Sequence, residues 1–246
     1  MTGRAGITVR RMPGGRLAVA IASVACLALA SAATASASPD AAKPAVPATQ
    51  QVVVLLKPQQ AHAKPSAHSK ALGMVPARTP ITGQRTALPV LGTYDQWLLV
   101  RLPGRPNGHT GWISERATDT AVTAWHLVVD LPHRTLTVYH AGHVVRVVKA
   151  VVGKSSTPTP TGEYFVEETI ALKASEVGAP FALALSARSN VLQDFEGGPG
   201  QIALHGLLNV GGVPGTAVSH GCIRLDNATM KWLAGRISAG APVTIV

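Results

Sequence analysis

The chain has 246 residues, enough for one sizeable domain or two small ones. Its composition, 46% hydrophobic and 14% charged, is that of a globular protein, and the formal net charge of +10 is compatible with anionic polymers or lipid headgroups as partners. The sequence has no basic run with interleaved aromatic residues, which argues against a nucleic-acid-binding protein.

Residues 1–37 predict a secretory signal peptide. Four arginines and no acid precede an apolar run from Leu17 to Ala30, which is shorter than the ~20 residues that a spanning helix needs. Ala35-Ser36-Ala37 then has the form of a signal-peptidase site, so we expect an exported, extracytoplasmic protein. The alternative is an uncleaved N-terminal anchor. If Cys26 leaves with the signal, Cys222 is the one cysteine of the mature protein and has no partner for an internal disulfide.

Residues 38–51 predict an Ala/Pro-rich linker, and residues 52–120 predict a small all-β module. The module combines a short apolar strand at 52–56 with a β-hairpin that joins 93–102 to 110–113. Its Trp-bearing strand, its turn "LPGRPNG" and its "TGWI" resemble the bacterial SH3-like modules found beside cell-wall enzymes. We expect Trp97 and Trp112 to pack in the core of this module.

Residues 121–246 predict a second, mostly β domain with one helix. A β-meander covers 125–152, and the turn Thr157–Gly162, rigidified by two prolines, leads into a further strand. Residues 172–192 predict a loop or flap followed by a strand. Asp226 is a suitable N-cap for a helix that contains Met230, Leu233 and Ile237, and a strand at 243–246 follows.

The sequence concentrates reactive side chains near its C-terminal end. A strand-like segment delivers His205 to Gly206 and a glycine-rich loop, and the chain returns as Ser219-His220-Gly221-Cys222-Ile223-Arg224. A cysteine attacks carbonyl groups as the thiolate, which a neighbouring histidine can generate at neutral pH. The amides of Gly221 and Cys222 are candidate donors to an oxyanion, and Arg224 lies on the same face as Cys222 if the segment is extended.

The "HG" and "SHGCIR" motifs, with the upstream "TPTG", resemble the L,D-transpeptidase (YkuD) catalytic domain over about residues 121–246. The resemblance implies that His205 is the base and is oriented by the carbonyl of Gly206. It also implies that His220 and Ser219 shape the cysteine loop, and that Arg224, Ser219 and Gly221 lie against the substrate. The implied acyl donor is a peptidoglycan tetrapeptide stem, which loses its terminal D-alanine and is passed to an amine on a neighbouring stem, without a cofactor; carbapenems are implied to acylate the same thiol. Leu207-Leu208 depart from the hydroxyl residue that many relatives carry after His-Gly.

Three alternatives remain open from the sequence. His205, His220 and Cys222 are three candidate ligands for a catalytic zinc, although no HExxH or CxxC spacing accompanies them. A non-catalytic wall-binding protein, in which the SH3-like module binds and the second domain is a relic, is the second alternative; anionic wall polymers are a partner compatible with the basic charge. An L,D-carboxypeptidase, in which water accepts the acyl group, is the third.

We expect the other histidines to face solvent; they are His62, His68, His109, His126, His133, His140 and His143. The sequence makes no prediction of oligomeric state.

Overall fold

The computed structural model describes residues 46–194 and 197–246. The predicted signal peptide, and residues 38–45 of the predicted linker, lie outside the described residues, so both stay predictions. The described residues belong to one compact unit. Within them, no helix is long and apolar enough to cross a membrane.

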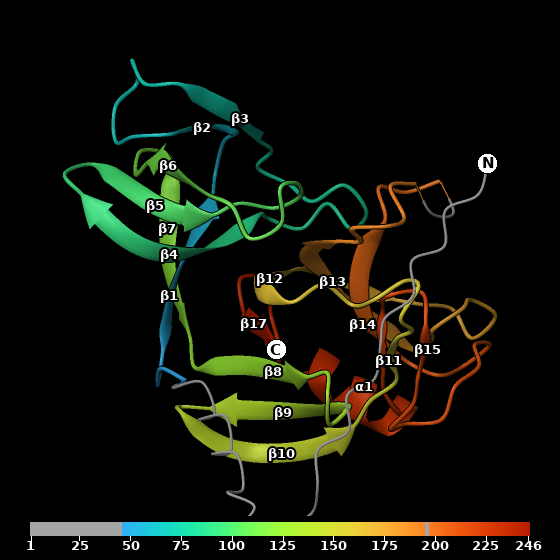
Figure 1. The fold of residues 1–246 in the computed structure, drawn as a ribbon. Helices are drawn as coiled ribbons and strands as arrows, with labels where there is room; N and C mark the ends of the chain where they lie inside the picture. The colour runs from blue at the N-terminus through green and yellow to red at the C-terminus, as the bar shows by residue number, and fades with distance from the viewer. Residues whose placement is uncertain (1–45, 195–196) are drawn as a thin grey trace, which may run out of the picture. The chain divides into compact units, whose positions relative to one another are not determined.

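In the described part of the chain, residues 50–123 form a seven-stranded sheet with the order β3-β2-β6-β5-β4-β1-β7 (Figure 1). β1 pairs antiparallel with both β4 and β7, so a strand from the start of the region lies between two later ones. β1 begins at Gln50, slightly before the predicted end of the linker at residue 51. The strands are β1 (Gln50–Leu55), β2 (Gln59–His62), β3 (Ala71–Val75), β4 (Ala87–Tyr94), β5 (Trp97–Arg101), β6 (Thr110–Ser114) and β7 (Thr118–Thr123).

The prediction that Trp97 and Trp112 pack in the core is wrong. Successive side chains on a strand face opposite ways, and the buried positions next to these tryptophans are Leu98 and Ile113. Both tryptophans are therefore only half buried, on the other face of the sheet. Trp97 meets His62 edge to face, with ring centroids 5.5 Å apart, and His62 is buried, contrary to the prediction that it faces solvent. The SH3-like identity of the region stays a prediction.

Residues 125–245 form an eight-stranded sheet, in the order β10-β9-β8-β17-β12-β13-β14-β16, and a two-stranded sheet of β11 and β15, counted over the described residues. Most neighbours are antiparallel, but β17 runs parallel to β8 and β14 runs parallel to β16. The strands are β8 (Trp125–Asp130), β9 (Thr135–His140), β10 (His143–Lys149), β11 (Val152–Gly153), β12 (Gly162–Ala171), β13 (Phe181–Arg188), β14 (Gln201–His205), β15 (Ala217–Ser219), β16 (Ile223–Arg224) and β17 (Pro242–Ile245).

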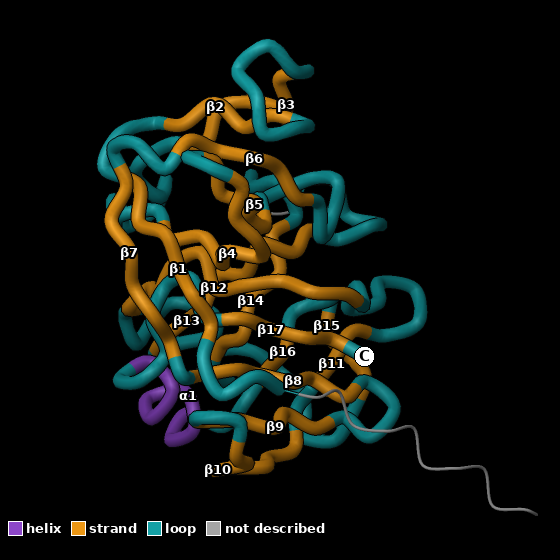
Figure 2. Tube along the Cα trace, turned by 90° about the vertical axis from the view of Figure 1, so that its left-hand side faces the viewer, coloured by secondary structure: helices purple, strands orange, loops and turns teal. Residues whose placement is uncertain are grey.

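The predicted helix is confirmed as α1 (Asn227–Ala234), the one helix in residues 46–194 and 197–246 (Figure 2). It begins after Asp226, whose carboxylate accepts hydrogen bonds from the amide and the hydroxyl of Thr229. Met230 and Leu233 are fully buried in the core of the second sheet. The prediction that Ile237 belongs to the helix is wrong, because the helix ends at Ala234 with Gly235 as its C-cap; Ile237 is buried beyond that end. The expectation of a mostly β fold with a single helix is thus confirmed.

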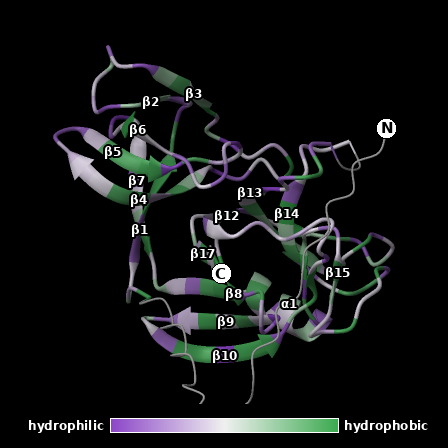
Figure 3. Cartoon of the chain, in the orientation of Figure 1, coloured by the Kyte–Doolittle hydropathy of each residue, from purple (hydrophilic) through white to green (hydrophobic). Residues whose placement is uncertain are grey.

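The second sheet ends at an exposed edge. Figure 3 shows hydrophobic residues along β10, and Val144, Val145 and Val147 are each about half exposed (51%, 48% and 57%). Arg146 leaves this strand to cover Trp232 of α1, and Arg236 approaches the same indole, with guanidinium carbons 4.4 and 4.6 Å from the ring centroid. These cation–π contacts connect the edge strand to the helix.

Candidate active site

The register of two parallel strands brings His205 and Arg224 to one face. Leu204 of β14 pairs with Ile223 of β16, and His205 pairs with Arg224. Leu204 and Ile223 are fully buried, so the strand alternation directs His205 and Arg224 to the opposite face. Cys222 precedes Ile223 and shares the face of Arg224 if the backbone continues extended. The sequence motif and the sheet register therefore agree.

His205 is held in the tautomer that suits a base. Its Nδ1 lies 2.8 Å from the carbonyl oxygen of Gly206, so Nδ1–H donates and Nε2 keeps its lone pair. Burial lowers the pKa of His205 below the ordinary histidine value; the bond to Gly206 acts in the opposite direction, and the charge of Arg224 lowers the pKa further. The imidazole is therefore neutral at pH 7 and able to accept a proton.

Gly206 occupies a position with no room for a side chain. A Cβ there would lie 2.0 Å from the carbonyl oxygen of Ala179 and 2.8 Å from Oδ1 of Asn227. The Gly206 amide donates to the carbonyl of Gly178 at 2.7 Å, and the next amide, that of Leu207, donates to Asn227 Oδ1 at 2.9 Å. The loop that orients His205 is thus fixed from both sides by close backbone approach.

The segment 172–180, predicted as a loop or flap, lies against His205. A Cβ on Gly178 would come within 2.5 Å of His205 Nδ1, and Gly178 itself has a positive φ of 84°. The Gly178 amide donates to the carbonyl of Leu208, and Asn209 donates to the carbonyl of Ala174. The segment is therefore bonded to the residues that follow His205-Gly206.

Residues 217–224, here called the cysteine loop, are organised by a buried hydroxyl. Ser219 is fully buried; its Oγ donates to the carbonyl of Cys222 at 2.6 Å and accepts from the amide of Gly221 at 3.1 Å. The loop-shaping role that the resemblance implied for Ser219 stays a prediction, and the buried side chain has no exposed surface for the expected substrate contact. The Gly221 amide is already bonded to Ser219, so it is not available as the predicted oxyanion donor. Cys222 is a half-buried thiol in this loop.

Two threonines of the Thr157–Gly162 turn donate hydrogen bonds to the backbone of the cysteine loop. Thr159 Oγ1 donates to the carbonyl of Gly221 at 2.8 Å and accepts from the amide of Gly153 at 2.9 Å. Thr157 Oγ1 donates to the carbonyl of Ser219 at 3.2 Å. The sequence analysis singled out this turn because its prolines and glycine make it rigid. It did not predict the hydrogen bonds of the two threonine hydroxyl groups.

The guanidinium of Arg224 has one nitrogen bonded to the glycine-rich loop and one without a bond within residues 46–194 and 197–246. Its Nη1 donates to the carbonyl of Gly211 at 2.5 Å, while its Nε is buried with no hydrogen-bond partner among the described residues. Burial lowers the pKa of Arg224, and the charge of Cys222 acts in the opposite direction. A buried, unsatisfied N–H beside the thiol is compatible with the carboxylate-binding role predicted for Arg224.

His220 is exposed between the buried residues Ser219 and Gly221 of the cysteine loop. Over residues 46–194 and 197–246, no three His, Cys, Asp or Glu side chains come together in a way that could hold a metal ion. The arrangement of His205, His220 and Cys222 therefore gives the zinc alternative no geometric support.

Comparison with known proteins shows what the second region of the chain is similar to. Residues 124–245 match the sequence model of the YkuD family, described as the L,D-transpeptidase catalytic domain. The chain is 29% identical over 147 residues to YkuD of Bacillus subtilis, covering 58% of this chain and 72% of the relative. It is 28% identical to L,D-transpeptidase 1 of Mycobacterium tuberculosis, covering 48% of this chain and about half (49%) of the relative. Among solved structures, an L,D-transpeptidase from Mycobacterium smegmatis matches with a TM-score of 0.39 and 21% identity, covering 65% of this chain and 82% of that one.

Proposed function

We propose that this protein is an exported peptidoglycan L,D-transpeptidase that works through an acyl-enzyme on Cys222. The observation that carries the proposal is the bond from His205 Nδ1 to the Gly206 carbonyl, which leaves Nε2 as an acceptor, while the β14–β16 register places His205 beside Arg224, two residues after the cysteine. A thiol next to a neutral, oriented imidazole is the arrangement that nucleophilic catalysis at a carbonyl requires.

The reaction has two halves. His205 Nε2 takes the proton of the Cys222 thiol, and the thiolate attacks the carbonyl carbon of a tetrapeptide stem. The C–N bond to the terminal D-alanine breaks, and the departing amine takes the proton from His205, leaving a thioester. An amine of a second stem then attacks the thioester and gives a proton to His205. The C–S bond breaks, the thiolate recovers this proton, and a 3-3 cross-link remains.

Arg224 contributes charge at this site. Its guanidinium stabilises the developing thiolate and disfavours a permanently protonated His205, which is consistent with the direction of the His205 pKa. We infer that its buried Nε–H also receives a carboxylate of the stem. Metals and organic cofactors have no step in this scheme.

Intact-mass spectrometry tests the proposal. We expect incubation with a carbapenem to add one drug mass at Cys222, and incubation with a tetrapeptide stem to release D-alanine. Both signals should be lost in Cys222→Ala, while circular dichroism shows that the variant is folded. Release of D-alanine without any cross-linked product, in the presence of an acceptor stem, would identify an L,D-carboxypeptidase. A folded protein that gives neither adduct nor D-alanine would instead favour the wall-binding alternative.

A further inference from the structure

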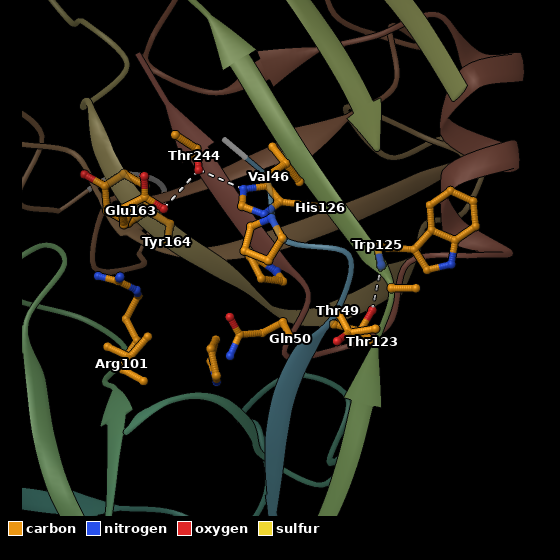
Figure 4. A pocket seen from close by; sticks show the side chains of 15 residues that line it. Val46, Thr49, Gln50, Arg101, Thr123, Trp125, His126, Glu163, Tyr164 and Thr244 are labelled. Carbon is orange, nitrogen blue, oxygen red and sulfur yellow. Dashed lines mark hydrogen bonds between the residues drawn. The ribbon is translucent and has the colours of Figure 1, made fainter. Parts of the chain in front are cut away.

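A cavity with two charged side chains in its wall lies apart from the catalytic residues, none of which lines it. Its volume is about 310 Å³, and strands of both large sheets contribute to its wall (Figure 4). The side chains that matter for the argument come from β1, β5, β8, β12 and β17; they are Gln50, Arg101, His126, Glu163 and Thr244. We call this cavity the charged pocket.

The charged pocket contains one positive and one negative side chain that are not paired with each other. Arg101 and Glu163 influence each other electrostatically, but among the described residues they form no ion pair within 4.0 Å. Arg101 donates from Nη1 to the carbonyl of Gly108 at 3.1 Å, and burial lowers its pKa. Since a guanidinium has five N–H donors, most of its hydrogen-bonding capacity remains for a ligand.

Glu163 is held in place by a relay of hydrogen bonds. Thr244 Oγ1 donates to Glu163 Oε2 at 2.9 Å, and His126 Nε2 lies 2.8 Å from the same hydroxyl oxygen. Because the threonine proton goes to the carboxylate, the histidine nitrogen must donate. Burial lowers the pKa of His126, so it is neutral at pH 7, contrary to the expectation of a solvent-facing histidine. Only Oε2 of Glu163 is engaged, and the carboxylate itself is exposed.

We propose that the charged pocket binds a small zwitterion that carries a carboxylate and a free ammonium group, as in an amino acid or a short peptide. Arg101 would receive the carboxylate and Glu163 the ammonium. A ligand of one sign alone would meet a like charge, whereas a zwitterion is complementary to both side chains. The apolar part of the ligand would contact Pro89, Leu91 and Pro242, which also line the cavity. A volume near the lower end of the usual range for ligand pockets suits a molecule of this size.

This proposal does not rest on the proposed function, although two zwitterions of that reaction belong to the class: the released D-alanine and the stem peptide. Isothermal titration calorimetry on the Cys222→Ala protein, which cannot turn over, measures binding. We expect D-alanine to bind with a Kd in the millimolar range or below. N-acetyl-D-alanine, which lacks the ammonium, and D-alaninamide, which lacks the carboxylate, should each bind at least about ten-fold more weakly.

Two conservative variants connect the binding to the pocket. Arg101→Gln and Glu163→Gln should each weaken D-alanine binding by at least about ten-fold, since each removes one charge and keeps a polar group. Arg116→Gln and Glu115→Gln are matched controls at exposed positions outside the pocket, and D-alanine affinity should not change. Melting temperatures verify folding; if Glu163→Gln is unfolded, Arg101→Gln and the two derivatives decide the question.

A tetrapeptide stem distinguishes the source of the ligand. If Arg101→Gln also weakens tetrapeptide binding about ten-fold, the pocket binds the stem. If it weakens the binding of D-alanine alone, the pocket binds the free amino acid. The proposal is overturned if D-alanine does not bind, if its binding survives Arg101→Gln, or if N-acetyl-D-alanine binds equally well. A failure of Cys222 to be acylated would overturn the proposed function and leave these binding results unaffected.

Discussion

The cysteine loop and the charged pocket are two polar sites built in opposite ways. The cysteine loop takes its shape from buried backbone groups, with Ser219 and Thr159 bonded to the carbonyls of Cys222 and Gly221. The charged pocket takes its properties from side chains, Arg101 and Glu163, that come from separate strands and keep unused capacity. The comparison teaches that substitutions next to the loop should act through position, whereas substitutions in the pocket should act through charge.

The largest effect outside Cys222 is expected for Gly206→Ala. The new methyl would overlap the carbonyl of Ala179 at 2.0 Å, so the loop that orients His205 must move. We expect the acylation rate with a carbapenem to fall about 100-fold or more, because small displacements of a catalytic group have effects of this size. Stopped-flow or time-resolved mass spectrometry measures the rate. Gly211→Ala is the control, since a Cβ there meets no atom within 4 Å; an equal loss in both variants would contradict the positional argument.

Thr159→Val removes a hydroxyl that joins Gly153 to the Gly221 carbonyl. The change leaves two buried backbone groups without their partner, which should lower the free energy of unfolding by about 1–3 kcal/mol. The acylation rate should fall about ten-fold, because the cysteine loop loses one of its supports. Urea denaturation and acylation kinetics measure the two quantities. Thr161→Val, at an exposed position of the same turn, should leave both near wild type, and a matching loss there would argue against a specific role for Thr159.

The pH dependence of acylation should report the charge of Arg224. The lowered pKa of His205 means that the imidazole stays neutral to a pH below the ordinary histidine value, so the acylation rate should decline only at lower pH. Arg224→Gln removes a positive charge that lowers this pKa. The pKa of His205 should then rise, and the acid limb of the pH–rate profile should move to higher pH. Arg116→Gln is an exposed control, and an unmoved acid limb in Arg224→Gln would refute the electrostatic role.

The smallest effect is expected at the start of α1. Asp226→Ala removes the cap that accepts from the amide and hydroxyl of Thr229, which should cost about 1 kcal/mol of stability and about 2–4 °C of melting temperature. The next residue, Asn227, accepts a hydrogen bond from the amide of Leu207, close to His205. The acylation rate of Asp226→Ala should therefore also fall slightly. Calorimetry measures the melting temperature. Asp119→Ala on β7 is the exposed control and should change neither quantity.

The sequence predicted the features that are encoded by neighbouring residues. It did not predict the contacts between residues that are far apart along the chain. The cysteine motif occupies six adjacent positions, and the helix after Asp226 has a local capping signal, so both were readable along the chain. The contact between Thr159 and Gly221 joins residues 62 apart, and the bond between His126 and Thr244 joins residues 118 apart. No local pattern encodes such pairs, which is why the charged pocket and the support of the cysteine loop emerged only from the structure.

The tryptophans also failed as a core signal, for a related reason. Alternation along β5 and β6 allows either face to be buried, and aromatic content alone does not decide which one is. Here the aliphatic residues Leu98 and Ile113 take the core, and the two indoles are left half buried on the other side.

The placement of the tryptophans makes the protein's own fluorescence informative. The chain has four: Trp97 and Trp112 lie on the first sheet, Trp125 lies on the second, and Trp232 lies on α1, which packs against the core of the second sheet. Replacing either pair with phenylalanine leaves emission from one of the two regions alone. Denaturant titrations of the two double variants can therefore be compared directly: coincident transitions mean that both sheets unfold as a single cooperative unit, and separated transitions mean that each has a stability of its own.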